Sequence, residues 1–129
     1  MPVRYEVDVA REVVFAFYWG KITFDDGRGF IVSVREDPRV QPHFRTLVDY
    51  AEATGLGEAG GYDRFAEYVE FYRSAGNGPR TARVALFVPE RSAVFGALRQ
   101  FLMMVNTDGH IQLYTDMNEA RAWVGLPVE

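Results

Sequence analysis

The order of short apolar runs and longer segments with helical spacing constrains the fold of this chain more than any other feature. Residues 3–9 alternate apolar and polar side chains, as in a strand with one solvent-exposed face. Residues 13–19 are apolar throughout and rich in β-branched and aromatic residues, which is typical of a central strand covered on both faces. A short turn separates them, so we predict a β-hairpin. Three later apolar runs also have strand character, at 45–50, 82–88 and 110–115.

Four segments between and after these runs have helical character. Thr23, with Asp26 three residues on, resembles a capping box. The helix that it begins should end before Pro38 and bury one face, made of Gly27, Phe30, Ile31 and Val34. We predict further helices at 62–75, ended by the GNGP sequence at 76–79, and at 90–105. We expect Asp116 to cap the last helix, with Glu119 at its third position, and Gly125 to close it.

The resulting order, ββαβαβαβα, predicts an α/β fold. Strands joined by helical crossovers lie parallel, so we expect a mixed five-stranded sheet with helices packed on it. With 129 residues, of which 48% are apolar, the chain should form a single domain over residues 1–129. It contains no cysteine, which excludes disulfides, thiolate metal sites and cysteine nucleophiles.

Charge and hydropathy limit the classes of partner. A net charge of −4 gives no electrostatic reason to expect nucleic-acid binding. The first apolar run follows acidic residues and is too short to span a bilayer, so we predict neither a signal peptide nor a membrane span. We expect a soluble, cytoplasmic protein.

The sequence offers few groups for catalysis or metal binding. Neither His43 nor His110 has a second histidine or a carboxylate at metal-ligand spacing, and there is no G-x-S-x-G motif. We therefore expect no catalytic residue, no metal and no cofactor. An enzyme would have to pair one of these histidines with a serine brought close by the fold, namely Ser33, Ser74 or Ser92.

The carboxyl ends of the predicted parallel strands mark a second place to look for a site. Five polar residues should converge there: Asp49, Glu90, Arg91, Thr115 and Asp116. Helix capping and helix first-turn positions explain Asp116 and Glu90 equally well. The small residues 51–61 predict a loop after the third strand, with Asp49 and Thr54 as candidate recognition residues. The Thr54 hydroxyl could equally bond to the backbone of a turn.

The predicted helix 62–75 has an unusually wide apolar face, and several of its residues are tyrosines. Such a face lies at the edge of a core, packs against a second chain or lines a pocket for an apolar ligand. On the helix 90–105, Met103 points away from the inner face and could contact a partner. The candidate partner or ligand contacts are Tyr62, Tyr68, Phe71, Tyr72 and Met103.

Several short motifs accompany this order of elements: TFDD at 23–26, DPR at 37–39, LVD at 47–49, VALFVP at 84–89 and DMNEARAWV at 116–124. Together they resemble the STAS domain, also described as SpoIIAA-like, of bacterial anti-sigma-factor antagonists. The sequence is most similar to the uncharacterised bacterial STAS/Sec14-like branch. The resemblance implies a SpoIIAA-like fold. In the antagonists, a partner kinase phosphorylates a serine in a loop before the second helix. Here Thr54 is the only serine or threonine between Asp49 and Tyr62.

Two functional hypotheses follow. The first is a non-enzymatic STAS-like regulatory or protein-interaction module for signalling. It would lack the phosphorylatable serine switch and bind a protein partner or itself as a homodimer. The second is a small carrier or sensor of an apolar, lipid-like ligand. It is motivated by ten phenylalanines, seven tyrosines and the small Gly27 and Gly29 in a helix. The second hypothesis requires an apolar cavity beside the first or second helix.

Overall fold

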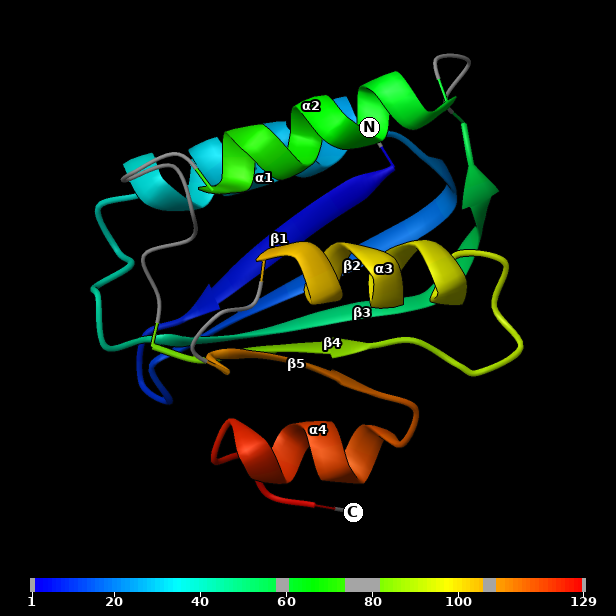
Figure 1. Cartoon of the computed structure of the whole chain (residues 1–129). Coiled ribbons are helices and arrows are strands. Elements are labelled where there is room, and N and C mark those ends of the chain that lie inside the picture. The colour runs from blue at the N-terminus through cyan, green and yellow to red at the C-terminus, as the bar shows by residue number, and fades with distance from the viewer. Residues whose placement is uncertain (1, 58–60, 74–81, 106–108, 129) are drawn as a thin grey trace.

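The computed structural model describes residues 2–57, 61–73, 82–105 and 109–128, and between 61 and 73 it describes the side chains of 66–72. The order of elements is the predicted ββαβαβαβα (Figure 1). The strands are β1 (Val3–Asp8), β2 (Val13–Ile22), β3 (Arg45–Leu56), β4 (Val84–Phe87) and β5 (Ile111–Tyr114). The helices are α1 (Phe24–Glu36), α2 (Gly61–Arg73), α3 (Phe95–Val105) and α4 (Met117–Trp123).

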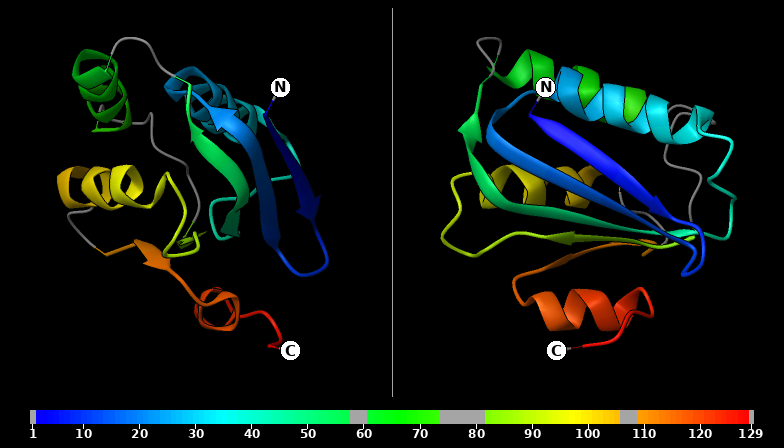
Figure 2. Two further views of the ribbon diagram at one scale, coloured as in Figure 1. Left: turned by 90° about the vertical axis from the view of Figure 1, so that its right-hand side faces the viewer. Right: turned by 180° about the vertical axis from the view of Figure 1, so that it is seen from behind.

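Within these residues, five strands form one sheet in the order β1-β2-β3-β4-β5. β1 pairs antiparallel with β2, and all later neighbours are parallel, which confirms the predicted mixed sheet. Helices α1, α2 and α3 lie on one side of the sheet and α4 on the other (Figures 1 and 2). On its side α2 forms an outer layer that contacts α1 and α3 and stands away from the strands (Figure 2, left).

Side chains alternate along the strands and so divide the core into two parts. Even-numbered residues of β2 and β3, such as Tyr18 and Tyr50, join the larger cluster under the three helices. Val13 and Leu47 face the opposite way and pack with α4. The predicted inner face of α1 is confirmed, because its buried residues are Gly27, Phe30, Ile31 and Val34.

Local capping chemistry sets three of the helix ends, as predicted. The Thr23 side chain accepts a hydrogen bond from the Asp26 backbone N–H at 3.1 Å, and the Asp26 carboxylate accepts one from the Thr23 N–H at 2.8 Å. Asp116 caps α4 by accepting from the N–H groups of Asn118 and Glu119. After α4 the chain turns at Gly125, whose φ of 78° suits glycine.

Three predicted boundaries are wrong. The second strand does not end at residue 19 but continues to Ile22. The third strand does not end at residue 50 but continues to Leu56, where Ala53, Gly55 and Leu56 pair with residues 20–22 of β2. The third helix begins at Phe95 rather than at residue 90. Tight turns occupy 90–94 instead, with the Ser92 hydroxyl accepting a hydrogen bond from the Val94 N–H at 3.2 Å. The GNGP sequence at 76–79 lies outside the described residues.

Candidate functional site

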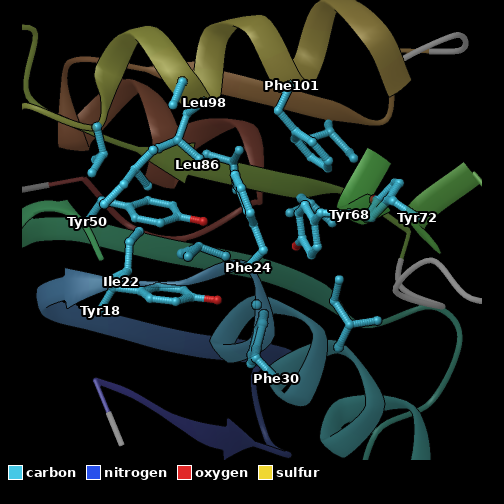
Figure 3. Close-up of a pocket in the computed structure, with 18 residues that line it drawn as sticks. Tyr18, Ile22, Phe24, Phe30, Tyr50, Tyr68, Tyr72, Leu86, Leu98 and Phe101 are labelled. Atoms are coloured by element: carbon cyan, nitrogen blue, oxygen red, sulfur yellow. The ribbon is translucent and has the colours of Figure 1, made fainter. Parts of the chain in front are cut away.

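An apolar cavity of about 80 Å³ lies between the sheet and the three helices on its larger side (Figure 3). It is partly open to solvent. Strands β2 to β5 provide the floor, α1 and α3 the walls, and α2 the roof. The residues that matter most for the shape of the cavity are Tyr18, Phe24, Gly27, Phe30, Tyr50, Leu56, Tyr68, Tyr72, Leu86, Ala97, Leu98 and Phe101.

Two stacked tyrosines form part of the cavity floor. The rings of Tyr18 on β2 and Tyr50 on β3 are 4.7 Å apart and within 10° of parallel. The Phe30 ring of α1 meets Tyr18 edge-on, with the ring centroids 6.2 Å apart. Tyr18 is 4% exposed and Tyr50 is 8% exposed, so both side chains are held in the core by close aromatic packing.

The roof depends on Tyr68 of α2. Its ring stacks on the Phe24 ring, with the centroids 5.5 Å apart, and packs against the Phe101 ring of α3, with the centroids 5.1 Å apart. Gly27 of α1 makes room for this ring, because a Cβ at residue 27 would lie 2.8 Å from the Tyr68 hydroxyl oxygen. Tyr72, one turn further along α2, meets Phe101 edge-on at 5.3 Å.

The hydroxyls of Tyr18, Tyr50 and Tyr68 point into the cavity (Figure 3). Burial raises the pKa of each of these phenols above its ordinary value, and the neighbouring tyrosines raise the pKa of Tyr18 further. All three are therefore neutral at physiological pH and can donate an O–H hydrogen bond. The cavity thus combines an apolar wall with a small number of convergent polar groups, which is the usual composition of a small-molecule site.

The candidate contact residues do not all lie at the cavity. Tyr68 and Tyr72 line the cavity. Phe71 packs against the edge of the core, and the Arg28 guanidinium carbon lies 5.0 Å from its ring centroid. Met103 is 80% exposed on the outer side of α3 and has no part in the cavity. The side chain of Tyr62 lies outside the described residues.

Asp49 and Thr54 do not share a recognition loop, contrary to the sequence analysis. Both lie in strand β3, where five residues span about 17 Å. Asp49 accepts a hydrogen bond from the Ala51 N–H at 2.8 Å and lines a shallow groove of about 370 Å³ on the α4 side, with Glu6 and Arg121. Thr54 is exposed near the end of the strand. The long pairing of β3 with β2 is the reason that this segment is not a loop.

Tyr18 and Tyr50 are not among the site residues that the sequence predicts. Each lies in a run of apolar strand residues, and at that level each looked like a core aromatic. The available signal was their chemistry, because a buried tyrosine hydroxyl normally finds a hydrogen-bond partner.

The histidines lie away from the cavity lining. The His43 ring contacts the Glu12 carboxylate at the surface before β3, and His110 precedes β5. Across residues 2–57, 61–73, 82–105 and 109–128, no group of three or more histidine, cysteine, aspartate or glutamate residues could hold a metal ion. None of the helices in these ranges is long and apolar enough to cross a membrane.

Comparison with known proteins supports the fold. No protein-family model matches the sequence, and no curated protein matches it at a significant level. Among solved structures, the chain is similar to an uncharacterised protein of the DUF3478 family with a SpoIIAA-like fold, from Shewanella loihica PV-4. The TM-score is 0.56 and the identity 15%, over 95% of this chain and 93% of that one. The chain therefore has the predicted SpoIIAA-like (STAS) fold.

Proposed function

We propose that this SpoIIAA-like domain is a non-enzymatic module that binds the apolar part of a small molecule in the cavity beneath α2. The cavity itself is the observation that carries the proposal. Protein cores are packed densely, with few voids larger than a water molecule. The space of about 80 Å³ beneath α2 departs from that dense packing. A bound apolar group would make contacts with its lining.

The size and opening of the cavity restrict what it can hold. An engineered apolar cavity of about 150 Å³ binds benzene, so this one, at about 80 Å³, encloses a smaller group such as a short chain or a five-membered ring. Because it is partly open, the rest of a longer molecule could extend past the rim, where Leu56 is 40% exposed. This geometry supports the carrier or sensor hypothesis, with part of the ligand enclosed and part outside.

Native mass spectrometry of gently purified protein tests this proposal. We expect the wild-type protein to retain added mass of small-molecule size. Ala97→Leu places a larger side chain at the cavity wall and should abolish that mass, whereas Gln100→Leu, at an exposed position of the same helix, should retain it. A wild-type protein without added mass, whose spectrum matches that of Ala97→Leu, would contradict the proposal.

A protein-interaction module is the second candidate function, supported by the outer surface of α3. Met103 is 80% exposed and Met104 37% exposed, and the position of Gly96 on the same helix opens onto free space among the described residues. Exposed methionines adapt readily to a partner surface. On this hypothesis the protein forms a homodimer or binds a regulatory partner without a serine switch. Met103→Glu should then dissociate a dimer that the same mass spectra would reveal.

A further inference from the structure

We propose that the cavity selects a neutral molecule carrying a carbonyl-type hydrogen-bond acceptor, whose oxygen accepts from the hydroxyls of Tyr18 and Tyr50. This inference rests on the proposed function, because it specifies the chemistry of the ligand at the same site.

The cavity hydroxyls are not bonded to other residues. Among the described residues, the hydroxyls of Tyr18, Tyr50 and Tyr68 make no hydrogen bond to another residue, and they are not among the fully enclosed polar atoms without a partner, so they open onto the cavity. A tyrosine hydroxyl in such a position needs an acceptor from the cavity to complete its hydrogen bonding. A group inside the cavity that accepts these hydrogen bonds would satisfy them.

The cavity hydroxyls of the two strands share a direction. Since the Tyr18 and Tyr50 rings are stacked and nearly parallel, their O–H groups point to the same side of the cavity (Figure 3). The Tyr68 hydroxyl faces them from α2 (Figure 3). A carbonyl oxygen has two lone pairs and can accept from two adjacent donors at once. The apolar remainder of the molecule would contact the leucine, isoleucine and phenylalanine side chains that surround the tyrosines.

The described lining of the cavity carries no charged side chain. The described lining contains no lysine, arginine or histidine to neutralise an anion. Burying an isolated carboxylate in such an environment is strongly unfavourable. The lining has no carboxylate for a cation either, although Asp26 lies close enough to raise the pKa of Tyr18 and Arg28 close enough to lower that of Tyr68. Neither charge belongs to the lining itself, and an uncharged lining suits a neutral ligand.

Four matched probes test this inference: cyclopentanone, cyclopentane, cyclopentanecarboxylate and cyclopentylammonium. Each is titrated into wild-type protein, Tyr18→Phe and Tyr50→Phe, and the methyl NMR signals of Ile31 and Leu86 report binding at the cavity. Phenylalanine retains the ring and removes only the hydroxyl. Tyr114→Phe is the matched control, because Tyr114 packs with the core on the α4 side.

Each Tyr→Phe change at residues 18 and 50 should weaken cyclopentanone binding about 2- to 10-fold, the usual effect of one neutral hydrogen bond. Cyclopentane should bind these variants as well as the wild type or better, and Tyr114→Phe should alter neither affinity. We expect both charged probes to bind more weakly than the ketone.

Three results would overturn the inference, and they differ in what they mean for the proposed function. If cyclopentane binds, and cyclopentanone binds to all variants with the same affinity, the site is apolar but does not recognise the carbonyl group. The proposed function then stands. If the carboxylate or the ammonium binds most tightly, the ligand class is wrong. If no probe shifts the Ile31 and Leu86 signals, both the inference and the proposed function fail.

Discussion

Replacing Gly27 with alanine tests how closely α1 and α2 approach over the cavity. A Cβ at this position would lie 2.8 Å from the Tyr68 hydroxyl oxygen and 3.1 Å from the ring carbon that bears it. Phe24 and Phe101 hold the Tyr68 ring on its other sides, so the ring can yield only by moving toward the cavity. Gly29 lies on the same helix, and no atom of the described residues is within 4 Å of a Cβ built there.

The two glycines give a matched pair because alanine changes helix propensity equally at both. That gain is about 1 kcal/mol per site. Gly29→Ala should therefore stabilise the protein by up to about 1 kcal/mol. At residue 27 the same gain is opposed by an overpacking cost of about 1–3 kcal/mol. The difference between the variants isolates the contact with Tyr68. For a chain of this length it corresponds to roughly 4–12 °C in Tm.

Thermal unfolding followed by circular dichroism measures this difference. We expect Gly27→Ala to melt below Gly29→Ala by that margin. Adding Tyr68→Phe to Gly27→Ala removes the nearest atom and should restore part of the loss. Equal Tm values for the two single variants would refute the reasoning, because they would show that the Tyr68 ring moves aside without cost.

Three further predictions concern caps and titrating groups. Hydrogen bonds from Arg39, and one from the Tyr5 hydroxyl at 2.9 Å, hold the pKa of Asp37 well below its usual range. A carboxyl whose pKa is lower in the folded than in the unfolded chain stabilises the fold at pH values above the unfolded pKa. The wild type should therefore be more stable than Asp37→Asn by its full margin above about pH 5, and that margin should shrink below about pH 4. Urea unfolding across this pH range checks the trend. A raised pKa changes stability with pH in the opposite direction, because the contribution is present below the unfolded pKa and is lost as the pH rises. The protein should therefore lose stability above about pH 10 through the buried phenols of Tyr18, Tyr50 and Tyr68. An ultraviolet absorption titration should show them ionising only as the protein unfolds, and early ionisation of all tyrosines would contradict this. Thr23→Ala should cost about 1 kcal/mol in urea unfolding, and Thr23→Ser, which retains the capping hydroxyl, much less.

Local chemistry made much of the fold predictable. The capping hydrogen bonds of Thr23 and Asp26 involve residues three apart, so the residue types alone mark the start of α1. Asp116 and Gly125 bound α4 for the same kind of reason. The exposed position of Met103 also follows from helical spacing, because it points away from the buried Phe101 and Val105.

Features that depend on distant partners were harder to predict. The small residues at the end of β3 have little strand propensity of their own, and they are in a strand because Ala53 and Leu56 pair with Gly20 and Ile22 of β2. The DPR motif is another example. Its Asp37 side chain is positioned by Arg39 nearby and by Tyr5, which is 32 residues away. In the sequence alone, only the first of these contacts could be suspected.

The candidate site lies at the boundary between what the sequence and the tertiary structure determine. The sequence by itself determined that Tyr68 and Tyr72 lie on the apolar face of a helix, because 3.6-residue periodicity places them there. Only the tertiary structure decided that these two side chains line a cavity within the chain. Three elements far apart in the sequence bring Tyr18, Tyr50 and Tyr68 together, and their packing leaves a space between them. The periodicity of a sequence shows which side chains face inward, but the shape of what they enclose depends on how distant elements pack.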